Sequence, residues 1–499
     1  MPGEYTFFGG SRLLTPFSDV IGLRIDQINF VACLWLCLPL SLLYYHYLPP
    51  EKASRRSRLL FPFLVGLAMC LFCFGTACKH ILADILLNYL IIRAVPTRYV
   101  HKLVFVSTMS YLSFIHLYRA VYCISNIVDI TGPMMVVTQK ATSLAFSLHD
   151  GLVKKRENLT KIQARELIAE VPSLLEYLSF MLQFQGILCG PACFYSDYIE
   201  FIDGKHYRSI LRSRNPEISI NGNNNKDNTN NLVRPSPYRV VGEKVVCCLF
   251  FMILAAFVTP LYPVERILSM EAASWGLARR FLFLWLAGFL ERVQYYYCWI
   301  LADALHNAAG FGFNGYDPEG RARWDLVSNV HVLQFELGGN LRESLAAWNC
   351  SSVQWLRRIS FDRVPPGYRT LSTYVLSAWW HGFFPGYYFT FLTAALLTLT
   401  ARTLRRALRH RFLARGRCWK AVYDCATTLA QMLAVAYVFP PFTLLHFWSA
   451  VHVYRRLYCS LHILCVLTLL LVPILLPDDA PTSTQETSEQ SSLEKKKEE

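Results

Sequence analysis

Long apolar runs recur along almost the whole chain, and they limit its fold more than any other feature. A helix needs about 17 to 25 mostly apolar residues to cross the hydrocarbon core of a bilayer. The clearest such runs are Ile25 to Leu48, Leu59 to Cys78, Leu103 to Ile124, Val245 to Leu261, Phe281 to Leu301, Phe383 to Leu399, Ala421 to Leu445 and His452 to Leu476. Hydrophobic residues make up 54% of the 499 residues and charged residues only 17%. The chain is therefore expected to cross a membrane several times.

Shorter or more polar stretches are expected to form further helices that are buried against protein. These are Ile81 to Ile92, Ser173 to Pro191, Leu326 to Leu345 and Leu371 to Trp380. Together with the long runs they predict an all-α, polytopic membrane protein of roughly ten or eleven transmembrane helices. We expect an N-terminal segment at 1–22 and one membrane domain at 23–477.

Two polar segments interrupt the apolar pattern. In the loop at about 205–243, the middle part Asn221 to Asn231 holds seven asparagines in eleven residues. Neither this loop nor the tail 478–499 has an apolar face to bury, so both are expected to be disordered. The tail ends in Lys496, Lys497, Glu498 and Glu499, which resembles the dilysine retrieval signal of endoplasmic reticulum membrane proteins. The sequence thus predicts a multi-pass protein of that membrane with a cytosolic C-terminus.

Charge and cysteine usage argue against two other classes of protein. The formal charge of +14 comes from basic residues in short loops between apolar runs, such as Lys52 to Arg58 and Arg402 to Lys420. That distribution is typical of cytosolic loops and not of a nucleic-acid-binding face. The sixteen cysteines are scattered through hydrophobic segments without metal-ligand spacing, so no metal site is expected.

His381 is the histidine most indicative of chemistry. It stands in an aromatic stretch, Ser377 to Tyr388, that also contains Gly382, Pro385 and Gly386. Proline breaks a helix, and glycine permits a bend or a close backbone approach. An ionisable side chain at membrane depth beside such a break is by default a functional hypothesis.

Asn349 is the second residue that requires an explanation. It lies 32 residues before His381, between Trp348 and Trp355, in a stretch compatible with a helix. An unpaired amide in an apolar medium costs several kcal/mol. Asn349 is therefore expected to contact protein, water or a substrate.

An ordered set of motifs resembles the membrane-bound O-acyltransferase family, in particular its lysophospholipid acyltransferase branch. The resemblance runs over about 23–477. Its strongest blocks are Thr131 to Lys140 with His149-Asp150-Gly151, Pro172 to Tyr177, Gly190-Pro191 with Asp197-Tyr198-Ile199, Ala309 to Phe313 with Trp324-Asp325-Leu326, and the segments around Asn349 and His381. The resemblance implies helices around an intramembrane reaction chamber.

The resemblance also implies roles for individual residues. It implies that His381 is the catalytic base and that Asn349 is a second active-site residue. Trp348 and Trp380 flank them and are expected to bind substrate. One departure is visible at Leu337 to Leu341, where relatives usually carry a run rich in Thr and Ser. It affects the expected helix shape and acyl-chain fit, and leaves the chemistry unchanged.

The chemistry of acyl transfer fits these residues. A base must take the hydroxyl proton as the oxygen attacks a thioester carbonyl, and imidazole, with an ordinary pKa of about 6.5, suits that task. The negative charge on the carbonyl oxygen needs a preplaced donor, worth about 2.7 to 4 kcal/mol. Asn349 is expected either to donate to that oxygen or to orient His381. Acyl-CoA is the expected co-substrate, and no bound cofactor is expected.

Other polar residues have two interpretations each. Cys350 would be a rival nucleophile, although the sequence offers it no base and most intramembrane cysteines are inert packing. Trp324 and Asp325 are interpreted as a structural pair at the cavity, with substrate contact left open. Lys205 and His206 are either ligands of a CoA or head-group phosphate or part of an ordinary membrane-surface cluster. Three carboxylates either belong to the site or form structural pairs with basic loop residues: Glu176, Asp197 and Glu200.

The favoured function is transfer of a fatty acyl group from acyl-CoA to the sn-2 hydroxyl of a lysophospholipid, in phospholipid remodelling. Because of the Thr138-Gln139-Lys140 and His149-Asp150-Gly151 blocks, the resemblance favours lysophosphatidylethanolamine or lysophosphatidylserine, with lysophosphatidylcholine also open. The alternatives are acylation of a protein, a sterol or diacylglycerol, and, outside enzymes, a membrane transporter. A homodimer is left open.

Overall fold

The structure is a computed structural model that describes residues 9–122, 128–208 and 234–476. Within these ranges it consists of helices and connecting segments, with one isolated β-bridge between Tyr316 and Ala322. The predicted all-α fold is therefore confirmed. The asparagine-rich part of the loop and the tail 478–499 lie outside the described residues, as do the last four residues that resemble a retrieval signal.

The longer helices form the body of the protein. They are α2 (Ile25–Tyr47), α3 (Arg55–Phe74), α4 (Cys78–Ala94), α5 (Thr97–Tyr122), α6 (Thr131–Leu152), α12 (Tyr238–Ile253), α14 (Leu277–Ala308), α18 (Arg369–His381), α19 (Pro385–Leu413), α20 (Arg417–Leu444) and α22 (Ser460–Leu475). The shorter ones are α1 (Thr15–Ile21), α7 (Lys161–Glu166), α8 (Leu174–Met181), α9 (Tyr195–Ile202), α13 (Met270–Ala273), α15 (Val332–Glu336), α16 (Leu341–Ala347), α17 (Cys350–Ile359) and α21 (Phe447–Arg456).

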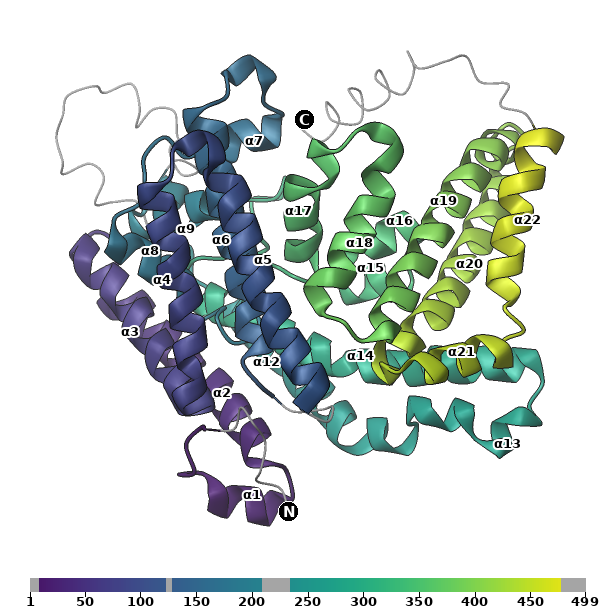
Figure 1. Cartoon of the computed structure of the whole chain (residues 1–499), viewed down its shortest axis with the longest axis horizontal. Helices are drawn as coiled ribbons and strands as arrows, with labels where there is room; N and C mark the ends of the chain where they lie inside the picture. Colours follow the sequence, from purple (N-terminus) through teal and green to yellow (C-terminus); the bar gives the residue numbers. More distant parts are fainter. Residues whose placement is uncertain (1–8, 123–127, 209–233, 477–499) are drawn as a thin grey trace.

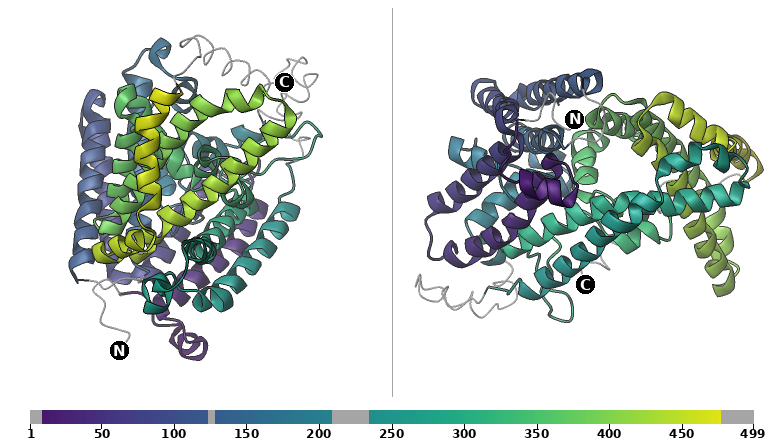
Figure 2. Two further views of the ribbon diagram at one scale, coloured as in Figure 1. Left: turned by 90° about the vertical axis from the view of Figure 1, so that its right-hand side faces the viewer. Right: turned by 90° about the horizontal axis from the view of Figure 1, so that it is seen from below.

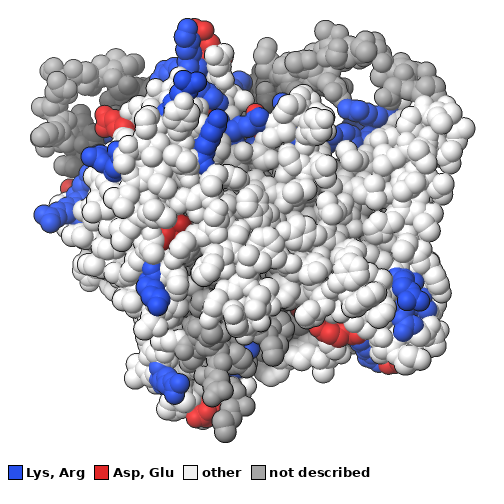
Figure 3. Space-filling model, in the orientation of Figure 1, with Lys and Arg blue, Asp and Glu red and all other residues white. Residues whose placement is uncertain are grey.

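The long helices form two groups that α14 connects. Helices α2 to α6 gather on one side and α18 to α22 on the other, with α14 crossing the lower end of the second group (Figures 1 and 2). Helix α14 contacts α2 of the first group and α20 of the second, and α12 packs along it. Figure 3 shows few charged side chains across the middle of one face, while Lys and Arg gather at its upper edge. Such a belt between charged ends fits a bilayer.

The polytopic class is supported by helices that are long and apolar enough to span a membrane. Among the described residues these are Ile25–Tyr47, Arg55–Ala94, Tyr238–Leu268 and Arg417–Leu444, with a fifth span if α21 and α22, bent by 74°, count as one. Helices α5, α6, α14 and α19 have 22 to 32 residues but carry more polar or charged side chains. That ten or eleven helices cross the bilayer stays a prediction.

Several predicted helices end earlier than the apolar pattern indicates. His452 to Leu476 is not one helix, because Tyr458 and Cys459 have positive φ and separate α21 from α22. In Ser173 to Pro191 only Leu174–Met181 is α-helical, and turns lead to the Gly190-Pro191 bond. Leu326 to Leu345 forms two short helices, because Gly338 and Gly339 interrupt it. A Cβ at Gly338 would lie 2.4 Å from the carbonyl oxygen of Gln334.

Helix α12 begins earlier than predicted, at Tyr238, inside the stretch that was predicted to be part of the polar loop.

Helix α6 was not among the predicted spans, yet it lies at the centre of the fold. Its residues are buried along nearly the whole length, although Thr138, Gln139, Lys140 and Thr142 interrupt any apolar pattern. Each of these side chains has a partner. Lys140, for example, donates from Nζ to the carbonyl of Phe180 at 2.8 Å. Buried polar groups that are satisfied in this way hold neighbouring elements in one arrangement.

Candidate active site

His381 lies at a sharp break between two helices. It is the last residue of α18, Gly382 follows with φ of 120°, and Pro385 begins α19. The ring is half-buried, and among the described residues neither of its nitrogens has a hydrogen-bond partner. Four aromatic rings surround it, with centroid distances of 4.6 Å for Trp380, 5.1 Å for Phe391, 5.1 Å for Phe442 and 5.6 Å for Tyr387. The imidazole is thus held in an apolar setting with its nitrogens available.

Asn349 occupies the capping position of α17 without acting as the cap. Its backbone has the left-handed conformation, with φ of 47°, which asparagine tolerates better than most residues. Asn329 caps the helix in its place: its carbonyl accepts the Cys350 N–H at 2.8 Å and its Oδ1 accepts the Ser351 N–H at 2.9 Å. The side-chain amide of Asn349 has no hydrogen bond among the described residues and is only half-buried. It is therefore available for another task.

Helix α6 supports both of the helices that carry these residues. On α17, the Trp355 indole donates to Thr142 Oγ1 at 2.8 Å, and Ser352 Oγ accepts from Gln139 at 2.6 Å. On α18, the Trp380 indole donates to the carbonyl of Met135 at 3.1 Å. The rings of Trp355 and Trp380 contact each other with centroids 5.4 Å apart. Since α17 and α18 share one support and touch, their positions are coupled.

Aromatic rings of α14 and α15 connect the surroundings of Asn349 with those of His381. Trp348 lies edge-on to Trp299 at 4.9 Å and to Tyr295 at 5.8 Å, and it packs on Phe335 at 4.9 Å. Tyr295 is also close enough to Tyr387 for the two to interact electrostatically, and Tyr387 contacts His381. Trp348 therefore lies among rings of α14 and α15, while Trp380 and Tyr387 lie against His381.

A buried ion pair joins α14 to α15 beside Trp348. Arg292 of α14 is fully buried and donates to both carboxylate oxygens of Glu336, at 2.9 and 2.8 Å, and the Tyr296 hydroxyl donates to the same carboxylate. A buried pair that loses one partner costs about 3 to 5 kcal/mol. The pair therefore anchors α15, and through Phe335 it holds Trp348 beside Asn349.

The structure separates the other predicted substrate-binding residues. Trp324 and His206 line one small pocket together with Tyr45, Arg58, Arg234 and Phe313. Asp325 and Lys205, which are adjacent in sequence to Trp324 and His206, do not line this pocket. Asp325 is exposed and accepts from Asn314 and Arg323, whereas the side chain of Lys205 is 70% exposed.

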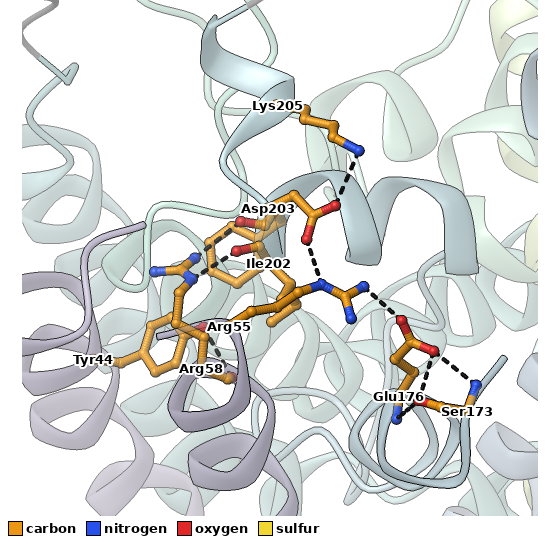
Figure 4. A network of polar contacts seen from close by, with 9 residues as sticks. Tyr44, Arg55, Arg58, Ser173, Glu176, Ile202, Asp203 and Lys205 are labelled. Carbon is orange, nitrogen blue, oxygen red and sulfur yellow. Dashed lines mark hydrogen bonds and ion pairs between the residues drawn. The ribbon is translucent and has the colours of Figure 1, made fainter. Parts of the chain in front are cut away.

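Lys205 belongs to a polar network at the protein surface (Figure 4). It pairs with Asp203 at 3.1 Å, and Asp203 also accepts from Arg55, which in turn donates to Glu176. Burial tends to raise the pKa of Asp203, but the hydrogen bonds and charges of Arg55 and Lys205 hold that pKa below its usual range. The carboxylate stays ionised at neutral pH and so keeps Lys205 paired.

The remaining candidates have structural contacts. Glu176 also closes a capping box with Ser173 at the start of α8, and Asp197 pairs with Arg165 at 3.5 Å. The Cys350 thiol donates to the carbonyl of Ala346 at 3.3 Å, and no imidazole is among its contacts in the described part of the chain. Within the described ranges, His, Cys, Asp and Glu side chains do not gather in a set that could hold a metal ion.

Known proteins match this chain over most of its length. The sequence model of the membrane-bound O-acyltransferase family matches residues 125–439, which include Asn349 and His381. Lysophospholipid acyltransferase 6 of Drosophila melanogaster is 40% identical over 474 residues, covering 94% of this chain and 64% of the fly protein. The chain thus spans just under two thirds of that relative's length.

Two further relatives are covered more completely. Membrane-bound glycerophospholipid O-acyltransferase 2 of Homo sapiens is 39% identical over 472 residues, which is 93% of this chain and 88% of the human protein. A lysophospholipid acyltransferase of Schizosaccharomyces pombe is 28% identical over 470 residues, which is 91% of this chain and 87% of the yeast protein.

Proposed function

We infer that this chain, which belongs to the membrane-bound O-acyltransferase family and is an acyltransferase, moves a fatty acyl group from acyl-CoA to the sn-2 hydroxyl of a lysophospholipid. One observation carries the proposal: Asn349 and His381 stand at the ends of two helices that touch through Trp355 and Trp380, and neither side chain has a hydrogen bond among the described residues. Polar groups left unpaired in an apolar setting are costly unless a ligand uses them.

The proposed reaction assigns one task to each side chain. A ring nitrogen of His381 takes the proton of the lysophospholipid hydroxyl while that oxygen attacks the thioester carbon. The Asn349 amide donates to the carbonyl oxygen as it becomes negative. When the tetrahedral intermediate collapses, the C–S bond breaks, and the CoA thiolate leaves and receives the proton from the imidazolium. The products are a diacyl phospholipid and free CoA, and His381 returns to its neutral form.

The aromatic surroundings support this chemistry in a further way. Trp348, Trp380, Tyr387, Phe391 and Phe442 offer few groups that would hold water near the imidazole. A water-poor chamber disfavours hydrolysis of the thioester and holds both lipids as neighbours, so that the reaction is effectively unimolecular. All of these residues come from one chain, so a monomer and a homodimer would each contain complete sites.

Other features support the proposed head group and compartment. The names of the relatives specify lysophospholipid or glycerophospholipid substrates. Within that class, the motif resemblance favours lysophosphatidylethanolamine or lysophosphatidylserine over lysophosphatidylcholine, with monounsaturated acyl donors. The pocket of His206 and Trp324 lies beside Arg58 and Arg234, whose positive charges support the proposal that it attracts a phosphate of CoA or of the lipid, although both guanidinium groups already have protein partners. We place the enzyme in the endoplasmic reticulum membrane with a cytosolic C-terminus, where acyl-CoA is available.

Purified protein with labelled oleoyl-CoA and a panel of acceptors tests the function directly. We expect labelled diacyl product from lysophosphatidylethanolamine and lysophosphatidylserine, less from lysophosphatidylcholine, and none from cholesterol, diacylglycerol or a peptide. Turnover without any gradient across a membrane distinguishes an enzyme from a transporter. Labelled sterol ester or triacylglycerol as the main product would contradict the proposed substrate class, and so would lipid movement across vesicles without acyl transfer.

A further inference from the structure

The carbonyl of Trp380 lies in the last turn of α18, where no following helical turn can donate to it. A histidine from a distant part of the chain supplies the missing donor. His116, on α5, is 5% exposed, and its Nε2 lies 3.0 Å from this carbonyl oxygen. Because a carbonyl only accepts, Nε2 must carry the proton. The hydrogen bond from His116 therefore satisfies a free carbonyl in the last turn of α18, directly before the His381 side chain.

The ring of His116 also covers the turn on the other side of His381. Gly382 follows His381 with φ of 120°, a conformation that favours glycine. A Cβ at this position would lie 3.0 Å from His116 Nδ1 and 3.1 Å from Cγ. Thus His116 contacts the peptide before His381 through a hydrogen bond and the residue after it through packing.

His381 has no hydrogen bond of its own among the described residues, so its direction depends on its backbone. His116 and His381 are close enough to interact electrostatically, and their rings belong to different helices. The next turn of α5 carries Arg119, which pairs with Asp129 at 3.4 Å and donates to Thr131 at 3.0 Å. That pair already has its partners. Ser113 of α5 also holds the end of α18, because its Oγ accepts from the Trp379 indole at 2.8 Å, but His116 is the α5 residue that contacts both sides of His381.

We propose that His116 is a positioning residue, which holds the last turn of α18 through the Trp380 carbonyl and thereby directs the His381 imidazole toward the substrate. The proposal rests on the proposed function, in which His381 is the base. His116 is not assigned as the base itself, because its ring is 5% exposed and its unprotonated Nδ1 packs against Gly382. Small misplacements of a reacting group are costly, about 100-fold in rate for a displacement of about 1 Å.

Three variants separate positioning from packing. His116→Phe keeps the ring and removes the donor, and it is expected to lower kcat about 10- to 100-fold with KM for both substrates nearly unchanged. His116→Gln places an amide N–H near the position of Nε2 and is expected to recover most of the lost kcat. His80→Phe is the matched control. Its imidazole, on α4, contacts the Tyr111 hydroxyl of α5 at 3.1 Å, and the loss of this contact should leave kcat unchanged.

The readouts are kcat and KM per folded protein, with His381→Ala in the same series. Wild-type kcat in His116→Phe, or equal impairment of the Phe and Gln variants, would overturn the positioning role. Should His116→Phe fail to fold, His116→Asn replaces it, because its shorter amide does not reach the Trp380 carbonyl, and the same loss is expected. Normal turnover by His381→Ala would instead refute the proposed function, so the two failures are distinguishable.

Discussion

Replacing His381 by alanine is expected to lower kcat by about 100- to 10,000-fold, the usual contribution of a general base. The amount of purified protein and its melting temperature should stay close to wild type. The ring is half-buried and has no hydrogen bond among the described residues, so its loss breaks no polar contact of the fold. Initial rates with saturating oleoyl-CoA and lysophosphatidylethanolamine measure the effect.

His462 provides a matched control for this variant. It is also a histidine on an apolar helix, but its ring nitrogens contact the Tyr437 hydroxyl at 2.6 Å and the Thr393 hydroxyl at 3.1 Å. His462→Ala should therefore lower the melting temperature and leave kcat per folded molecule near wild type. A His381→Ala enzyme that turns over at the wild-type rate would show that another group takes the hydroxyl proton.

The Asn349→Ala variant is expected to lose about 100- to 1000-fold in kcat, because removing one hydrogen-bond donor to the oxyanion usually has an effect of this size. The backbone adds a second effect, because alanine in the left-handed conformation costs about 1 to 2 kcal/mol. Asn349→Gly separates the two, since glycine adopts a φ of 47° without that cost. The glycine variant should be more stable than the alanine variant and equally slow.

The comparison is made with kcat and melting temperature on the same preparations. If Asn349→Gly regains wild-type kcat, the amide has no catalytic role and the alanine defect comes from the backbone. A rise in KM at unchanged kcat would instead place Asn349 in ground-state binding.

Mass spectrometry of the slow variants also reports on Cys350, because an acyl group on that thiol would establish the rival covalent route.

Local sequence was sufficient to predict the break that places His381. Gly382 and Pro385 predict the end of one helix and the start of the next. In the structure α18 ends at His381 and α19 begins at Pro385. Aromatic residues beside His381 and Asn349 likewise predict an apolar setting, which Trp348 and Trp380 provide. These features are local because backbone conformation and immediate neighbours decide them.

The supports of the site could not be predicted in the same way. Gln139 and Ser352, which join α6 to α17, are 213 residues apart, and His116 and Trp380 are 264 apart. Asn329 caps α17 from a preceding loop, a task that local rules assign to Asn349 itself. In α6 the polar residues Thr138, Gln139 and Lys140 interrupt the apolar pattern and so concealed the helix. Such contacts arise from tertiary packing and leave no periodicity in the sequence.

The same limit explains the separation of Lys205 from His206. Adjacent in sequence, they are open to two interpretations, phosphate ligands or a membrane-surface cluster, but the structure separates them: Asp203 holds Lys205 at the surface, while His206 lines the pocket with Trp324. Neighbours on one helical turn point in different directions. Which side of the turn faces the pocket depends on helices that lie far away in the chain.

The central claim is that His381 and Asn349 act on the same thioester, and the bound substrate itself tests it most directly. The measurement is an experimental structure of the His381→Ala enzyme with intact oleoyl-CoA. The account predicts that the thioester carbonyl oxygen lies about 2.7 to 3.1 Å from the Asn349 amide, with its carbon facing the space left by the imidazole. A thioester bound elsewhere, for example beside His206 and Trp324, with Asn349 facing empty lipid, would contradict it.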